Sequence, residues 1–463
     1  MFHGQVAATR DVAAPIPGCL DVMVSGLCTF ALAFLLGGLS AAAAGAQPAS
    51  SLASFNSDLE QLTLRQAEIF FAGRNREIQF GQRLVEGAQA DRLSAAARPN
   101  PSVFINATQI GSQYPPGYDY SRPDRRADTT IGINQTFERG GKRELRMQAA
   151  DQNITASRGD YADIQRQQKV VLYAAYYDLI AAQEKLRITT ETAGLFQKTI
   201  DAVERRLKAG DIAASDVARI RVDALRARND ARTAQAERQK AQTALAYVIG
   251  AERDAARIKA VDNWPELSAA SDTLEIEKAL AGRADVQAAQ ARVQAAEKSR
   301  ELARALRTRD VTALVQLDRT PWNPLANPTS VNTVGFGISM PLFTNYYFEG
   351  EIRRAEVDLQ TARDNFERVR ALALGEIVKS RADLDAAHER VQRFRESLLK
   401  EAQKAADAAE YAYTRGAIGV MDLLDARRQL YATRLEASST QADYAKSLAA
   451  WQAATASVQI EPN

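Results

Sequence analysis

Hydrophobic residues recur along most of the chain at alternating spacings of three and four positions. One such run consists of Phe196, Ile200, Val203, Leu207 and then Gly210. This spacing places the apolar side chains on one face of an α-helix, and its continuation is typical of coiled coils. Proline, which interrupts helices, is absent from 125–263 and from 342–461. The pattern predicts long helices, the first over 140–209, roughly 70 residues and about 100 Å.

The helical pattern occurs twice. RLKAG at 206–210, followed by Asp216, aligns with AYTRG at 412–416, followed by Asp422. After each glycine the apolar pattern resumes, in one copy as Val217, Ile220, Ala224, Ala227 and in the other as Leu423, Ala426, Leu430, Thr433. A repeat spanning nearly half of the chain favours one architecture built twice over several unrelated domains. Each copy is predicted to form a helix, a glycine turn and a second helix.

Four segments between the helices alternate with period two instead. They are PSVFINATQ (101–109), TTIGINQTF (129–137), VTALVQL (311–317) and TVGFGISMP (333–341). Each has an apolar side and a small or polar side, over the roughly nine residues of a transmembrane β-strand. A soluble β-hairpin packed on one face would show the same alternation. Long loops at 110–127 and 318–331, on one side only, favour outer-membrane strands with the loops outside.

Four strands are too few to close a barrel. In lipid, an open sheet edge leaves backbone groups unpaired, at several kcal/mol each. If the chain spans a membrane, it must therefore associate with further copies. Eight strands from a dimer would give an interior filled by side chains, whereas twelve from a trimer would leave a lumen.

The N-terminal region predicts export. Residues 22–39 are apolar and uncharged, and they run into the small-residue stretch SAAAAGAQPA. This arrangement predicts an export signal over 1–46, cleaved near Ala46; a retained membrane-spanning anchor is the alternative. Cys19 and Cys28 both precede the predicted cleavage point. The mature chain would therefore carry no thiol, lipid anchor or disulfide.

Composition excludes several classes of function. The net charge is +2, with acidic and basic residues interspersed, which excludes a nucleic-acid partner. Beyond the export signal, His388 is the one histidine and cysteine is absent, so one chain is predicted to hold no metal site and no cofactor. His388 is expected to be solvated.

GGKRE (140–144) lacks the spacing of a phosphate loop and is predicted to turn from strand to helix, with its basic residues at the inner membrane face. No catalytic constellation is present, which predicts a non-enzyme.

The chain resembles the TolC family of outer-membrane efflux proteins over about residues 57–458. The resemblance rests on the duplicated plan and on RLKAG (206–210), ALAYVIG (244–250) and YTRGAIGVMDLLDA (413–426). The segment QTFERGGKRELR (135–146) resembles the heavy-metal branch of the family, the outer components of cobalt, zinc, cadmium, nickel or copper exporters.

The resemblance implies a fold that is mainly α with a membrane β part. It implies a homotrimer in outer-membrane lipid, whose twelve-stranded β-barrel continues into a periplasmic tunnel of twelve helices. The implied partners are a periplasmic adaptor of the membrane-fusion type and a proton-driven inner-membrane pump of the resistance-nodulation-division (RND) type. The cell would be a Gram-negative bacterium and the cargo divalent cobalt, zinc, cadmium or nickel. A duct for drugs or secreted polypeptides is the alternative within transport. A periplasmic coiled-coil adaptor or structural rod would share the helices but lack the strands.

The resemblance also implies roles for particular residues. The periplasmic constriction would be formed by Asp422 and Asp425, with Tyr413 and Asp216 helping to hold it closed. The adaptor would contact the two glycine turns through Arg206, Leu207, Gly210 and Gly416. Where the best-known closing contact of the family has an arginine, two residues after the second glycine, this chain has Ile418. Closure is therefore expected to be looser.

The predicted organisation follows from these elements. Its segments are an export signal (1–46), an N-terminal segment with the first helix (47–100), an outer-membrane β-hairpin (101–137), a periplasmic helical hairpin (138–250), an equatorial linker (251–274), a helix (275–310), a second β-hairpin (311–341), a second helical hairpin (342–458) and a C-terminal tail (459–463).

Overall fold

The computed structural model describes residues 59–108, 127–268, 276–320 and 329–456. They all belong to one unit, Phe55–Asn463. The predicted export signal, most of the two predicted loops between strands and the C-terminal tail lie outside the described residues.

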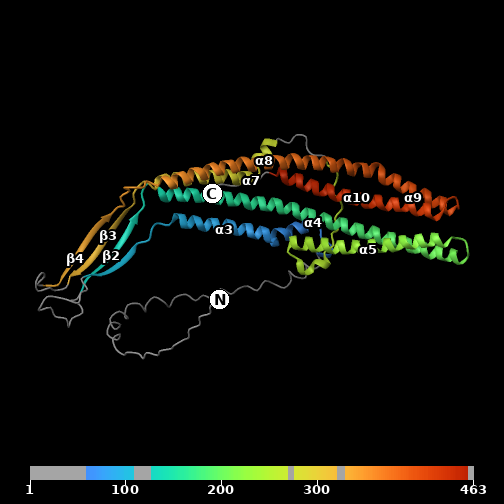
Figure 1. Ribbon diagram of the computed structural model, residues 1–463, viewed down its shortest axis with the longest axis horizontal. Helices are drawn as coiled ribbons and strands as arrows, with labels where there is room; N and C mark the ends of the chain where they lie inside the picture. Colours follow the sequence, from blue (N-terminus) through green and yellow to red (C-terminus); the bar gives the residue numbers. More distant parts are fainter. Residues whose placement is uncertain (1–58, 109–126, 269–275, 321–328, 457–463) are drawn as a thin grey trace, which may run out of the picture. The chain divides into compact units, whose positions relative to one another are not determined.

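The chain builds the same succession of elements twice (Figure 1). In each copy, two helices precede two antiparallel strands, a very long helix and a returning helix. The first copy consists of α2 (Leu64–Arg74), α3 (Arg76–Ala96), β1 (Ser102–Thr108), β2 (Asp128–Phe137), α4 (Lys142–Lys208) and α5 (Ala214–Ile249). A 3-10 turn, η2 (Glu252–Arg257), follows it. The second consists of α6 (Ile276–Ala281), α7 (Ala284–Ala305), β3 (Val311–Thr320), β4 (Val331–Ser339), α8 (Glu349–Arg393), the π turn η3 (Phe394–Leu398), α9 (Leu399–Thr414) and α10 (Val420–Thr455).

The long helices follow the predicted periodicity. α4 is one helix of 67 residues, and its seam residues Phe196, Ile200 and Val203 are buried against α5. The returning helices α5 and α10 have the same length, 36 residues. In the second copy the long helix is interrupted by η3 before it continues as α9.

Two expected helices are each divided in the structure. The N-terminal helix is broken at Asn75, whose side chain accepts from the Ile78 N–H at 3.0 Å and donates to the Val248 carbonyl at 3.0 Å. The helix expected over 275–310 is broken before Arg283 into α6 and α7. In both places a buried polar side chain bonds to another helix, which the local apolar spacing does not reveal.

All four strands join one antiparallel sheet in the order β1-β2-β3-β4. β2 and β3 come from different copies, and their pairing joins the two halves of the chain. The register brings apolar side chains into continuous rows on one face. One row consists of Val103, Ile133, Val315 and Phe336, and the next of Ile105, Ile131, Leu317 and Val334. The predicted alternation is confirmed, and β3 extends to Thr320, beyond its expected end.

The opposite face of the sheet carries mainly small and polar residues, together with the larger apolar side chains Phe104 and Leu314. Gly132 lies beneath the Phe104 ring, which a larger side chain at that position would meet. The Thr130 hydroxyl donates to Asp318 at 2.6 Å, and the Gln316 amide donates to the same carboxylate at 2.9 Å. The sheet therefore presents one apolar face and one mainly polar face with internal hydrogen bonds.

The turn from β2 into α4 is held by ion pairs. Gly140 and Gly141 both have positive φ, +76° and +67°, which glycine adopts without steric cost. The next residue, Lys142, is buried and its ammonium lies 2.9 Å from both carboxylate oxygens of Asp310. Arg146 pairs with Glu138. Of the two basic residues expected at the inner membrane face, Lys142 thus binds a carboxylate of the chain itself, and Arg143 donates to the Ala96 carbonyl at 2.7 Å.

Buried apolar residues form three clusters. One joins α2, α4, α5 and the segment 258–260, and it includes Ala445 of α10. A second lies among α6, α7, α8 and α10. The third lies near the glycine turns. Among the described residues, no helix combines the length and apolarity needed to cross a bilayer.

Candidate gate and docking site at the hairpin turns

The two glycine turns have the same hydrogen bonds. In the first, the Gly210 N–H donates to the Leu207 carbonyl at 3.0 Å and the Asp211 N–H to the Arg206 carbonyl at 2.9 Å. In the second, Gly416 donates to Tyr413 and Ala417 to Ala412, both at 2.9 Å. This is the Schellman arrangement, in which a left-handed residue ends the helix. The duplication therefore extends to individual backbone bonds.

Both turns require glycine because of backbone conformation. Gly210 has φ +80° and Gly416 has φ +76°, and a Cβ atom at either position would meet no atom within 4 Å. A residue other than glycine therefore costs strain, about 1–2 kcal/mol at each position, without a clash.

Replacing Gly210 and Gly416 together with valine is expected to abolish export while leaving membrane insertion intact. The strain distorts only the turns, which the resemblance described above implies as adaptor contacts. Resistance and outer-membrane content should be measured in parallel. Gly194→Val, at an exposed position inside α4 with no neighbouring atom within 4 Å, is the matched control. Unchanged resistance in the double valine variant would contradict a docking role for the turns. A loss of the protein from the outer membrane would show that the turns serve folding alone.

Polar bonds between the two arms are duplicated as well. Arg221 pairs with Glu204 at 2.7 Å in the first hairpin, and Arg427 pairs with Glu410 at 3.0 Å in the second. Farther from the turn, Arg228 donates to Gln197 and Arg434 donates to Gln403. All four bonds involve residues at matching positions of the two copies. The two hairpins thus share the same polar bonds between their arms.

The two candidate gate aspartates are exposed residues at the start of α10. They lie three positions apart and so on one helical face. Asp422 accepts from the Gly419 N–H at 3.2 Å, which satisfies one unpaired donor at the helix start. Asp425 pairs with Arg428 at 2.7 Å. Each aspartate thus already has a partner within the chain.

Tyr413 and Asp216 are half-buried, in the last turn of α9 and the first turn of α5. Within the described part of this single chain, no hydrogen bond connects them. The contact implied for them between neighbouring coils is therefore not made inside one chain. Ile418 lies between Gly416 and the start of α10, and it is half-buried.

Arg428 is a site residue that the sequence did not single out. Its guanidinium contacts Asp425 of its own helix and also Asp223 of α5, at 3.4 Å. Asp223 is largely buried, with 16% of its side chain exposed. The Asp425–Arg428 spacing was visible in the sequence, but Asp223 belongs to the other copy. Arg428 therefore links the second hairpin to the first.

Apolar packing joins the same two hairpins. Leu424 of α10 is buried in the cluster formed by α4 and α5, and Val420 and Met421 pack against it. The candidate gate aspartates therefore lie on a helix end that is anchored on its opposite face. Their position depends on both hairpins.

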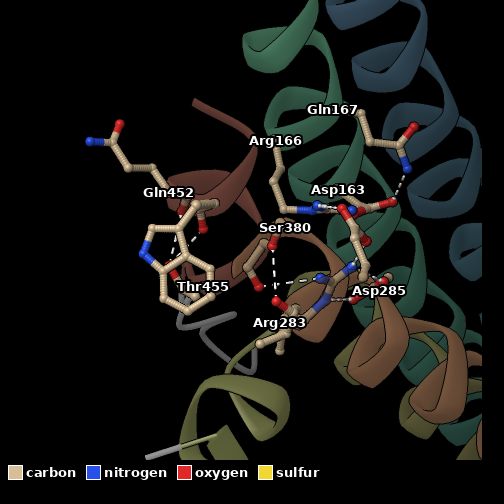
Figure 2. A network of polar contacts seen from close by, with 12 residues as sticks. Asp163, Arg166, Gln167, Arg283, Asp285, Ser380, Gln452 and Thr455 are labelled. Atoms are coloured by element: carbon tan, nitrogen blue, oxygen red, sulfur yellow. Dashed lines mark hydrogen bonds and ion pairs between the residues drawn. The ribbon is translucent and has the colours of Figure 1, made fainter. Parts of the chain in front are cut away.

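A second polar cluster lies far from the turns in the sequence (Figure 2). Arg283 is only 1% exposed. It donates to both carboxylate oxygens of Asp285 at 3.0 and 2.8 Å, to Glu376 at 2.6 Å and to the Ala454 carbonyl at 3.2 Å. A buried arginine thus binds residues of α7, α8 and α10 together.

The cluster continues into the first copy through Arg166 of α4. Its guanidinium donates to Glu376 at 2.9 Å and to Asp163 at 2.8 Å, so Glu376 bridges two arginines. Burial alone would raise the pKa values of Glu376 and Asp285, but hydrogen bonds from the arginines outweigh it and hold both pKa values below their usual range. The carboxylates are therefore kept ionised, and the cluster joins the two copies.

Potential metal ligands are dispersed over the described ranges. Within those ranges, no group of three or more histidine, cysteine, aspartate or glutamate residues is placed to hold a metal ion. His388, expected to be solvated, is instead half-buried, with its ring centroid 6.2 Å from that of Tyr444.

Comparison with known proteins agrees with this arrangement. The family model described as outer membrane efflux protein matches residues 45–251 and 276–457. The cobalt-zinc-cadmium resistance protein CzcC of Cupriavidus metallidurans is 23% identical over 383 residues, which cover 81% of this chain and 85% of that protein.

Solved structures show the same fold. The transmembrane channel protein CusC aligns with a TM-score of 0.71 at 18% identity, covering 86% of this chain and 93% of CusC. The outer membrane protein VceC of Vibrio cholerae aligns with a TM-score of 0.67 at 21% identity, covering 85% of this chain and 96% of VceC. The resemblance and the fold class predicted from the sequence are confirmed. Because the family model matches most of both copies of the repeat, the chain belongs to the outer membrane efflux protein family.

Proposed function

We propose that this outer-membrane protein is the exit duct of a tripartite, proton-driven system that exports divalent heavy-metal cations, namely cobalt, zinc, cadmium and nickel. Membership of the efflux family makes it a transport duct and not an enzyme. The observation that carries the metal assignment is its similarity to a cobalt-zinc-cadmium resistance protein across 81% of the chain. A periplasmic adaptor and an inner-membrane RND pump would complete the system.

We propose a homotrimer, which the sheet supports. Among the described strands, β1 and β4 each pair on one side only. The sheet of one chain therefore has two open edges. The apolar rows are exposed; Phe336 and Ile338 are about four-fifths accessible. Pairing these edges with the sheets of two further chains would satisfy the backbone donors of the edge strands and turn the apolar rows toward lipid. Twelve strands would leave room for a lumen.

The turns are proposed to work as gate and docking points. In a trimer, Asp422 and Asp425 would form two stacked rings of three carboxylates, which need water or a cation to lie close together. Such rings attract cations. Tyr413 and Asp216 would meet across neighbouring coils. Arg206, Leu207, Gly210 and Gly416 would contact the adaptor.

Deleting the gene is expected to lower several-fold the concentrations of cobalt, zinc, cadmium and nickel that permit growth. Expressing the chain from a plasmid should restore them. Growth on a panel of drugs is measured in parallel, because deleting a drug duct would increase drug sensitivity and leave metal tolerance unchanged. Unchanged metal tolerance with increased drug sensitivity would refute the metal assignment.

Cell fractionation distinguishes the duct from a rod. The complemented strain should contain the chain in the outer membrane as a heat-modifiable oligomer. Recovery in the soluble periplasmic fraction would favour the adaptor or rod and contradict the proposal.

A further inference from the structure

The two hairpin turns have the same backbone but opposite surface chemistry. At matching positions, the first has Arg205, Arg206 and Lys208 where the second has Tyr411, Ala412 and Thr414. Arg219 of the first copy likewise corresponds to Asp425 of the second. The difference lies on the surface, because the cap bonds and the bonds between the arms are the same in both.

The three cations of the first turn are exposed. Over the described residues, none of the three takes part in an ion pair. Cations in the last turn of a helix interact favourably with its dipole. However, α9 ends in the same backbone arrangement with no basic residue in its last turn. The helix end therefore does not itself require them.

The second turn offers no equivalent positive surface. The cation within this turn, Arg415, lies 5.2 Å above the Tyr411 ring in a cation-π contact. Arg427 and Arg428, farther along α10, pair with Glu410 and Asp425. Asp216 and Asp422 occupy matching positions, and the first turn also carries the exposed Asp211. Three basic residues outweigh these acids at the first turn, whereas Asp425 adds a further negative charge at the second. An acidic partner would therefore be attracted to the first turn and repelled by the second.

We propose that Arg205, Arg206 and Lys208, the cationic triad, form the charge-selective docking point for an acidic surface of a periplasmic protein. The inference rests on the proposed function and refines it, because it assigns different partner chemistry to the two turns. Three clustered cations raise the rate of encounter with an acidic surface and restrict its orientation. At the second turn, Gly416 would contact the adaptor without this attraction between charges.

The test measures association of the full-length channel, purified in detergent, with the purified periplasmic adaptor encoded in the same genome. Substituting the cationic triad as Arg205→Gln, Arg206→Gln and Lys208→Gln is expected to lower the association rate about tenfold at low salt. The difference should shrink as added salt screens the charges. Substitution to glutamate at the same positions should lower the rate further.

Matched controls use the second turn. Tyr411→Gln with Thr414→Gln changes equivalent positions without removing charge, and it should leave the salt dependence unchanged. Because all substituted residues are exposed, outer-membrane content and helical circular dichroism should equal those of the wild type.

The outcomes separate this inference from the proposed function. Wild-type binding that is insensitive to salt and survives the triple glutamine substitution would overturn the inference alone. Salt-dependent binding to vesicles of anionic lipid, with binding to the adaptor unaffected by the substitutions, would also overturn it. If the wild type bound no adaptor at any salt concentration, the proposed assembly itself would fail, and the inference with it.

Discussion

Replacing Asp422 and Asp425 together with alanine is expected to bring the cation-to-anion permeability ratio of the channel down toward unity. The same variant should lose block by multivalent cations added from the periplasmic side. In the proposed trimer these residues would place six carboxylates at one narrow opening, where low-dielectric walls would strengthen their field. Single-channel conductance and reversal potential in planar bilayers measure both effects.

The contacts of the two aspartates allow sharper variants. Asp425→Asn removes the charge but keeps a side chain that can accept a bond from Arg428. Asp422→Asn likewise keeps an acceptor for the Gly419 N–H. Both asparagine variants should reproduce the loss of selectivity if charge is the cause. Asp407→Ala, an exposed aspartate on α9, is the control. Unaltered selectivity and block in the double alanine variant would place the constriction elsewhere.

Replacing Arg283 with alanine is expected to destabilise the protein by about 3–5 kcal/mol, the usual cost of removing one member of a buried ion pair. Asp285 and Glu376 would be left close together without their shared cation. The shift in the denaturant midpoint, followed in detergent by tryptophan fluorescence, measures the loss. Arg292→Ala, which breaks a partly exposed pair with Asp160, should cost less than about 1 kcal/mol. A similar cost for both variants would contradict this account.

The dependence of stability on pH tests the same cluster independently. Because the pKa values of Asp285 and Glu376 are lower in the folded protein, their ionised forms stabilise it above the unfolded values near 4. That stabilisation is lost as the pH falls through the folded values. The wild type should therefore lose stability in acid. Without Arg283 the contribution is already reduced, so the difference in stability between wild type and variant should narrow as the pH falls below the unfolded values near 4 and through the lowered folded values.

The sequence by itself determined the periodic elements of this protein. The seam of α4 and α5, the alternating strands and the two glycine turns all follow from local geometry. Helical spacing places every third or fourth side chain on one face, and a strand places every second one. The left-handed residue that ends each long arm is specified by one glycine. These features needed no knowledge of distant contacts.

Only the tertiary structure decided how these elements meet. β2 and β3 pair across copies, and Arg428 of α10 reaches Asp223 of α5. The break before α7 depends on Arg283, whose partners include Glu376 and Ala454, 93 and 171 positions away. A buried charge is stable only where distant partners converge on it. Periodicity records which face of an element is apolar, but not which residue of another element completes a polar site.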